Sequence, residues 1–210
     1  MRLQPLIVPG WNNSGPTHWQ SLWEACLPRA VRVQQRDWTS PNVHEWTCAL
    51  AAAIEAAPRP PLLIAHSLGC ITVCHLPLRI REKVAGALLV APADVEREGA
   101  PEALRSFCPI PMQTLPFQSV VVASTNDPYC SLERAREFAQ AWGSRFEQIE
   151  NGGHINADSG FGAWPHGLKL LAALRRRAHW RIPIAPCRTP PLPPPHSAGP
   201  QHRSPHRASH

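Results

Sequence analysis

The chain has 210 residues, of which 43% are hydrophobic, and this is enough for one domain with a full core. Its formal charge of +6 comes from six arginines after residue 175, because residues 1–175 carry equal numbers of basic and acidic side chains. A nucleic-acid-binding protein would carry its basic residues on the folded part, so this distribution argues against a nucleic-acid partner.

The seven cysteines form neither a CxxC pair nor a regular framework. Free thiols in a reducing compartment fit this pattern best. The first residues hold too short an apolar stretch for a secretory signal, and no run of about 18 apolar residues occurs. We therefore expect a cytoplasmic protein with no membrane partner.

Short apolar runs alternate along the chain with longer segments of helical periodicity. The expected strands are residues 5–8, 31–34, 62–65, 87–91, 120–124 and 146–149, and the expected helices are 17–26, 42–57, 68–80, 132–142 and 164–176. This alternation is typical of βαβ units, and it predicts an α/β fold with a mainly parallel sheet and helices on both faces. Right-handed crossovers would bring all strand C-termini to one edge, where such sheets bind ligands.

The loop after the first expected strand begins the segment "PGWNNSGPTHW". It is rich in glycine, but it lacks both G-x-x-x-x-G-K-[ST] and G-x-G-x-x-G, so a nucleotide site is not expected. His18, Trp19 and Trp23 fall on one face of the first helix. We interpret them as core or as the wall of a pocket.

The segment "LLIAHSLGC", residues 62–70, runs from a buried strand into a helix and places Ser67 at the corner. A nucleophile elbow needs such a turn, with small neighbours and a helix N-terminus that points amides at a developing oxyanion. Ala65 replaces the first glycine of G-x-S-x-G, and an ordinary helix N-cap is the alternative for this motif alone. The loop after the first strand would lie beside the elbow, so we expect the backbone N–H groups of Trp11 and Leu68 to form an oxyanion hole.

Residues 92–118 connect the fourth and fifth expected strands, where a cap domain would insert. This connection is short and contains several prolines, so we expect no large cap and a shallow site that favours compact substrates. Cys70, Cys74 and His75 follow the elbow serine on the same helix. We interpret them as small core residues and expect no metal.

Two further polar residues complete a Ser, acid, His order along the chain. Asp127 follows the fifth expected strand in "STNDPYC", and His154 follows the sixth in "ENGGHINAD". Ser67 would be the nucleophile and His154 the base, while Asp127 would orient the imidazole and stabilise its cation. Asp94 is the rival acid, but an acid on the later strand is the more usual arrangement. Asp158 is interpreted as a cap or loop anchor.

Six ordered blocks resemble a known family: "PGWNNSGPTHWQSLW", "DW", "LLIAHSLGC", "ALLVAPAD", "STNDPYC" and "GGHINADSGFGAWPHG". They are similar to the small α/β-hydrolase-fold serine hydrolases grouped with the YdeN proteins and retinoblastoma-binding protein nine. The resemblance implies a compact α/β hydrolase whose nucleophile, acid and base fall on Ser67, Asp127 and His154. The retinoblastoma-binding motif L-x-C-x-E is replaced by residues 68–72, LGCIT, so retinoblastoma binding is not expected.

After residue 177 the composition changes to a stretch dense in Pro, His, Arg and Ser. Such a segment cannot bury enough apolar surface to offset its ordering entropy. We therefore predict an α/β-hydrolase domain over residues 1–177 and a disordered or polyproline-like tail over 178–210. The tail is interpreted as a dispensable extension, with docking to a proline-recognition domain or an anionic surface as the alternative.

The sequence thus predicts a carboxylesterase-like serine hydrolase that cleaves a small carboxylic ester through an acyl-enzyme intermediate, without a cofactor. Thioesters and activated amides stay open, because the same three side chains attack each of them. Acyl transfer to an acceptor other than water is a weaker alternative. An interaction protein that uses the hydrolase body and the Pro-rich tail is a second hypothesis, and the complete Ser, Asp and His set argues against it. A histidine base predicts activity that rises with pH as the ring loses its proton.

Overall fold

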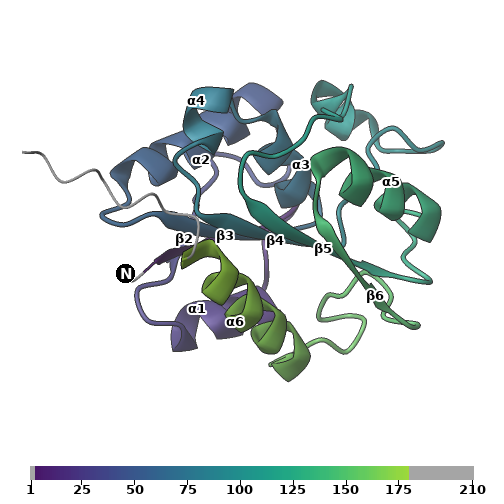
Figure 1. Ribbon diagram of the computed structural model, residues 1–210. Helices are drawn as coiled ribbons and strands as arrows, with labels where there is room; N and C mark the ends of the chain where they lie inside the picture. Colours follow the sequence, from purple (N-terminus) through teal and green to yellow (C-terminus); the bar gives the residue numbers. More distant parts are fainter. Residues whose placement is uncertain (1–2, 180–210) are drawn as a thin grey trace, which may run out of the picture.

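A sheet of six parallel strands separates two layers of helices (Figure 1). The computed structural model describes residues 3–179. The strands are β1 Gln4–Val8, β2 Val31–Arg32, β3 Pro61–His66, β4 Gly86–Val90, β5 Gln118–Ser124 and β6 Arg145–Ile149. Their order across the sheet is β2-β1-β3-β4-β5-β6, and every neighbouring pair is parallel. The predicted parallel α/β sheet is confirmed.

The helices are α1 Trp19–Cys26, α2 Val43–Ala56, α3 Leu68–His75, α4 Leu78–Arg81, α5 Leu132–Trp142 and α6 Pro165–His179, with a 3-10 helix η1 over Glu102–Phe107. Helices α1 and α6 cover one face of the sheet, and α2 to α5 cover the other (Figure 1). Successive strand side chains point to opposite faces. In β3, Leu63 therefore joins the core that contains Trp46 of α2, and Ile64 joins the core that contains Trp19 of α1.

The two central strands β3 and β4 are buried along their whole length. Their sequences, PLLIAH and GALLV, are nearly continuous apolar runs, as expected for strands covered on both faces. The edge strand β6 is only partly buried. This arrangement places Ser67, which directly follows β3, in the middle of the edge formed by the strand C-termini.

The expected elements are present, with ends that differ from the prediction by at most three residues, apart from the helix predicted over 68–80. That prediction is wrong in one respect, because the segment forms two helices, α3 and α4. Pro77 stands between them as the N-cap of α4. Proline has no backbone N–H and its ring clashes with the preceding helical turn, so the first helix ends before it.

The connection between β4 and β5 holds the short helix η1 and no cap domain, as predicted. At the C-terminal end, α6 runs to His179, two residues beyond the boundary expected at 177. The tail predicted beyond that point lies outside the described residues. Within residues 3–179, none of the helices is both long and apolar enough to cross a bilayer.

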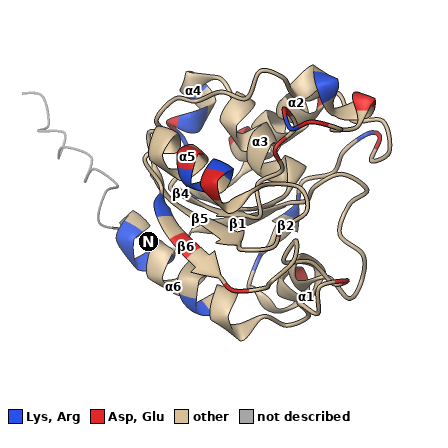
Figure 2. Cartoon of the chain, turned by 90° about the vertical axis from the view of Figure 1, so that its right-hand side faces the viewer, with Lys and Arg blue, Asp and Glu red and all other residues tan. Residues whose placement is uncertain are grey.

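Charged residues are distributed unevenly over the helices (Figure 2). Helix α5 carries both signs, whereas the charged residues of α6 are all basic. Arg175 and Arg176 of α6 line a groove together with Leu3 and Leu62, which lie at the starts of β1 and β3. The basic end of α6 is therefore at the edge of the sheet opposite to Ser67.

Candidate active site

Ser67 sits on a strained turn between β3 and α3. Its backbone has φ 54° and ψ −125°, a conformation that non-glycine residues rarely adopt. The Ser67 N–H donates to Val90 O at 3.0 Å, and a Cβ on Gly69 would run into the carbonyl oxygens of Val8 and Pro9. Close packing between β1, β3 and β4 therefore holds the serine in this conformation, with its side chain half-buried at the sheet edge.

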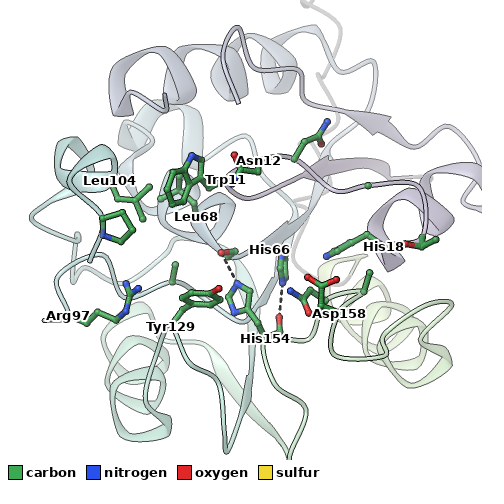
Figure 3. Close-up of a pocket in the computed structure, with 18 residues that line it drawn as sticks. Trp11, Asn12, His18, His66, Leu68, Arg97, Leu104, Tyr129, His154 and Asp158 are labelled. Carbon is green, nitrogen blue, oxygen red and sulfur yellow. Dashed lines mark hydrogen bonds between the residues drawn. The ribbon is translucent and has the colours of Figure 1, made fainter. Parts of the chain in front are cut away.

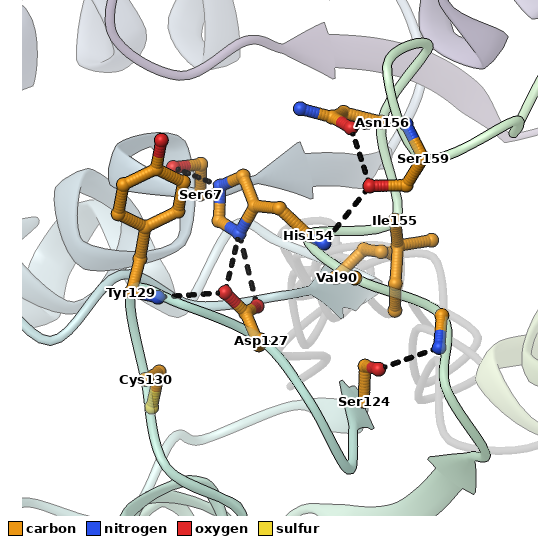
Figure 4. A network of polar contacts seen from close by, with 12 residues as sticks. Ser67, Val90, Ser124, Asp127, Tyr129, Cys130, His154, Ile155, Asn156 and Ser159 are labelled. Carbon is orange, nitrogen blue, oxygen red and sulfur yellow. Dashed lines mark hydrogen bonds and ion pairs between the residues drawn. The ribbon is translucent and has the colours of Figure 1, made fainter.

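Three side chains predicted from distant parts of the chain form one hydrogen-bonded series (Figure 4). His154 Nε2 lies 2.9 Å from Ser67 Oγ, and His154 Nδ1 lies 3.0 and 2.9 Å from the two carboxylate oxygens of Asp127. A carboxylate can only accept, so Nδ1 carries the ring proton and Nε2 is left to accept the Ser67 O–H. The hydroxyl is therefore placed to give its proton to an imidazole.

The loop after β6 holds His154 in this position. The His154 N–H donates to Ser159 Oγ at 3.2 Å, and the His154 carbonyl accepts from His66 Nε2 at 2.9 Å. Asp127 is fixed separately, since its Oδ1 also accepts the Tyr129 N–H at 2.9 Å. Both ends of the histidine backbone and the carboxylate are thus restrained by groups outside the series.

Asp94, the rival acid of the sequence analysis, has a different environment. Its Oδ1 accepts the Glu96 N–H at 3.1 Å, and its Oδ2 lies 3.6 Å from Arg134 Nε. These contacts fix the loop after β4. Of the two candidate acids, Asp127 is the one that contacts His154.

The loop after β1 lies directly against the elbow. A Cβ at Gly10 would be 2.7 Å from Ser67 Cβ and 3.3 Å from Leu68 N, so this position has room only for glycine. Trp11, the next residue, lines the same cleft as Ser67 and Leu68. Within the described part of the chain, no carbonyl or side chain accepts a hydrogen bond from the Trp11 or Leu68 backbone N–H.

The buried Gln20 and the half-buried Arg32, which no pattern in the sequence singles out, support this loop. Gln20 Nε2 donates to Ile64 O at 2.9 Å and to Val8 O at 3.2 Å, and its Oε1 accepts the Ser14 hydroxyl at 2.6 Å. Arg32 donates to Asn13 Oδ1 at 2.6 Å and forms an ion pair with Glu24 at 2.7 Å. Arg32 also donates to Ser14 O at 3.0 Å and to Ser21 Oγ at 2.7 Å.

No sequence motif marks these residues. A glutamine and an arginine at these positions fit an ordinary exposed face equally well, and only the fold brings their partners together.

Indole groups of α1 support the other side of the site. Trp19 Nε1 donates to Ile155 O at 2.8 Å, next to His154, and Trp23 Nε1 donates to Ala163 O at 3.0 Å. Both rings are fully buried and pack with Trp164. The interpretation of Trp19 and Trp23 as core residues fits this burial, and α1 anchors the loops on both sides of Ser67.

A row of three histidines runs away from Ser67. The ring centroids of His154 and His66 are 4.8 Å apart, and those of His66 and His18 are also 4.8 Å apart. Burial, with the charge of Arg32 as a smaller cause, lowers the pKa of His18 to about 4. Burial, with the neighbouring histidines as smaller causes, lowers the pKa of His66 well below its usual value. Both rings are therefore neutral near pH 7.

Ser67 and His154 open into a cleft of about 460 Å³ whose lining differs on its two sides (Figure 3). We call the side that includes Leu68 and Leu104 the apolar half, and the side that includes His18 and Asp158 the polar half. Figure 3 shows Trp11, Leu68, Leu104, Arg97 and Tyr129 on the side of the apolar half, and His18 and Asp158 on the side of the polar half; Asn12, Asn13, Gly15, Thr17, Asn156 and Ala157 also line the cleft. The reacting atoms would lie between the two halves.

Asp158 differs from its interpretation as a loop anchor. The side chains that tie this loop together are Asn156 and Ser159, which hydrogen bond to each other at 2.8 Å. Asp158 is exposed and lines the cleft. Its carboxylate is therefore available to a molecule bound there.

The cysteines on α3 are core residues, as interpreted from the sequence. Cys70 and Cys74 are fully or almost fully buried, and burial raises the pKa of both thiols, so they stay protonated. Within residues 3–179, no group of three or more His, Cys, Asp and Glu side chains is placed to hold a metal ion.

A parallel sheet with a serine on a strained turn after a central strand, and with an acid and a histidine after later strands, defines an α/β hydrolase. The serine hydrolase family model matches residues 5–173. The chain therefore belongs to the serine hydrolase family.

Among solved structures, a YdeN-like hydrolase from Pectobacterium atrosepticum is 36% identical, with a TM-score of 0.75, over 84% of this chain and 92% of that chain. The ydeN gene product of Bacillus subtilis is 20% identical, with a TM-score of 0.67, over 83% and 100% of the two chains. Esterase 2 of Thermogutta terrifontis shares the fold at 19% identity and a TM-score of 0.63, over 87% and 86% of the chains. No curated protein matches the chain. The predicted resemblance to YdeN-like serine hydrolases and the predicted fold are confirmed.

Proposed function

We propose that the protein is a carboxylesterase-like serine hydrolase that cleaves small carboxylic esters through an acyl-enzyme on Ser67. The observation that carries this proposal is the series of contacts from Ser67 Oγ to His154 Nε2, and from His154 Nδ1 to Asp127. A serine hydroxyl is a weak nucleophile until a base removes its proton. An imidazole held by a carboxylate is such a base.

In the first half of the reaction, Ser67 Oγ attacks the ester carbonyl carbon as its proton passes to His154 Nε2. The tetrahedral intermediate then collapses, and the departing alkoxide takes the proton from Nε2 and leaves as the alcohol. In the second half, water attacks the acyl carbon as its proton passes to His154 Nε2. The bond between Ser67 Oγ and the acyl carbon then breaks, Oγ takes the proton back from Nε2, and the acid leaves. Asp127 stabilises the imidazolium formed in each half.

The negative charge on the carbonyl oxygen needs donors that are already in place. The backbone N–H groups of Trp11 and Leu68 fit this role, because Gly10 brings the first loop against Ser67 and Leu68 lies at the N-terminus of α3. Neither group needs to give up a partner in the described part of the chain. We therefore assign the oxyanion hole to these two amides.

The shape of the cleft favours small substrates. Its volume is about 460 Å³, and the connection between β4 and β5 adds η1 but no cap domain over the site. A long acyl chain would leave most of its surface in water. Compact carboxylic esters therefore fit this site better than long lipids.

Labelling by a fluorophosphonate probe tests the nucleophile, and a panel of short p-nitrophenyl esters tests the reaction. Esterase 2 of Thermogutta terrifontis has been obtained phosphonylated by cyclosarin, which is related chemistry. We expect the unchanged protein to label and to hydrolyse the short esters, and Ser67→Ala to lose labelling and at least about 10⁴-fold in kcat. Equal labelling of Ser67→Ala would remove Ser67 as the nucleophile.

A further inference from the structure

Among the described residues, the buried ring N–H group of His18 finds no acceptor. Its Nδ1 accepts the Gln20 N–H at 3.1 Å, as the N-cap of α1. The proton of the neutral ring is therefore on Nε2. His18 is only 6% exposed, and within residues 3–179 Nε2 has no hydrogen-bond partner. Buried donors are almost always paired in native proteins, so an unpaired one calls for an explanation.

The position of His18 supplies the explanation. Its side chain lines the cleft that also contains Ser67 and His154, and Figure 3 shows it pointing from the start of α1 toward His66. Its ring centroid is 4.8 Å from that of His66, which packs in turn against His154. The unpaired donor therefore belongs to the wall of the site, one side chain away from the proposed base.

The groups around His18 define what would bind beside it. The polar half of the cleft offers the His18 donor and the exposed carboxylate of Asp158. A hydroxyl group can accept from the first and donate to the second, whereas a carbonyl can only accept and an ammonium can only donate. The other half holds the apolar side chains of Trp11, Leu68 and Leu104, and its polar groups, the Arg97 guanidinium and the Tyr129 hydroxyl, do not include a carboxylate.

We propose that the polar half binds a hydroxylated part of the ester, and that His18 is a specificity residue whose Nε2–H donates to a hydroxyl oxygen there. Asp158 accepts the proton of the same or a neighbouring hydroxyl. The substrate class is then an ester with a compact apolar part on one side of the scissile bond and a hydroxylated part on the other. This proposal rests on the esterase function proposed above.

Two pairs of esters test the substrate class. The first pair, 2,3-dihydroxypropyl butanoate and propyl butanoate, differs only in hydroxyls on the alcohol side. The second pair, methyl 3-hydroxybutanoate and methyl butanoate, differs only in a hydroxyl on the acyl side. In one pair we expect kcat/KM to be about tenfold higher for the hydroxylated ester, chiefly through a lower KM. The pair that responds shows which side of the ester occupies the polar half.

Two variants separate substrate recognition from the capping of α1. Asparagine reproduces the Nδ1 acceptor of histidine but does not reach the Nε2 position, so His18→Asn keeps the cap and removes the donor. Glutamine reaches the Nε2 position but lacks the capping acceptor, so His18→Gln keeps the donor and weakens the helix start. His44→Asn is the matched control, since His44 is exposed on α2, outside the cleft.

Under the proposal, His18→Asn brings the ratio of kcat/KM within the responding pair to about one, while His18→Gln and His44→Asn keep most of it. If His18 were purely structural, the order of the two variants would be reversed. His18→Gln, which lacks the cap of α1, would then be the impaired variant, and His18→Asn would not. Equal kcat/KM within both pairs for the unchanged protein would overturn the proposal, as would a His18→Asn variant that keeps the preference. If the unchanged protein hydrolysed none of these esters through Ser67, the proposed function would be overturned instead.

Discussion

The two groups of polar residues around Ser67 differ in what their side chains contact. Asp127 and His154 contact the serine or each other and have few other partners among side chains. Gln20 and Arg32 contact no reacting atom, but they hold the carbonyl and amide groups of the first loop in place. The first group would supply the chemistry, and the second keeps the proposed oxyanion donors where the chemistry needs them. Changes in the two groups should therefore have different effects.

The largest expected effect is on the first group. His154→Asn removes the base but keeps a polar side chain of related shape, so we expect kcat to fall by about 10⁴-fold. The free energy of unfolding should change far less, because the surrounding backbone contacts of residue 154 remain. Steady-state kinetics and urea unfolding measure the two quantities on the same preparation. A variant that keeps a tenth of the activity would contradict the role of His154.

Arg32→Met tests the second group. It removes a side chain that is 9% exposed, together with its ion pair and its contacts to the first loop. We expect a loss of about 3 kcal/mol in the free energy of unfolding. We also expect about a tenfold lower kcat, because the Trp11 amide is no longer held against Ser67.

Arg79→Met is the matched control for this change, since Arg79 forms an exposed pair with Glu55 at 3.4 Å. We expect it to cost less than about 1 kcal/mol and to leave kcat unaltered. Equal losses of stability in the two variants would show that the contacts of Arg32 stabilise the fold no more than an exposed ion pair does.

The pH dependence of stability gives the next largest effect. The pKa of His18 is about 4 in the folded protein and 6.5 in an unperturbed histidine, so between these values the unfolded chain binds more protons. Stability should therefore fall as the pH drops from 6.5 toward 4. At pH 5, His18 alone should lower the free energy of unfolding by up to about 2 kcal/mol. His66 contributes in the same direction. Urea unfolding at pH 7 and pH 5 measures this effect. The free energy of unfolding should decrease less between these pH values in His18→Asn than in the unchanged protein, and equal decreases would contradict the lowered pKa of His18.

The smallest expected effect is that of Trp19→Phe, which removes the hydrogen bond to Ile155 O next to His154. We expect a loss of about 1 kcal/mol in stability and a severalfold lower kcat. Trp46→Phe is the control, because it removes a similar bond to Asp37 O at 3.2 Å in the other helical layer. It should lower stability without changing kcat. If both variants change kcat alike, the indole of Trp19 has no specific effect on the site.

The sequence predicted the strands and the reacting side chains for identifiable reasons. The apolar runs of β3 and β4 are distinctive because both faces of these strands are covered. Ser67, Asp127 and His154 each follow such a run, and parallel strands bring their C-termini to one edge. Their convergence could therefore be predicted without coordinates.

Other features could not be predicted in this way. The end of α3 at His75 depends on Pro77, which stands inside a pattern whose apolar residues are otherwise helical in spacing. The roles of Gln20 and Arg32 depend on partners from other segments of the chain, and the role proposed for His18 depends on an Nε2 that has no partner within residues 3–179. Polar residues of this kind have no periodic or motif signal, so only the folded arrangement shows what they do.

Peptide mapping after fluorophosphonate treatment, at a fixed time and concentration, tests most directly whether His154 activates Ser67. We expect one phosphonate adduct per chain, located on Ser67 in the unchanged protein and nearly absent from His154→Asn. An adduct on another residue, or equal modification of Ser67 in the two proteins, would contradict it.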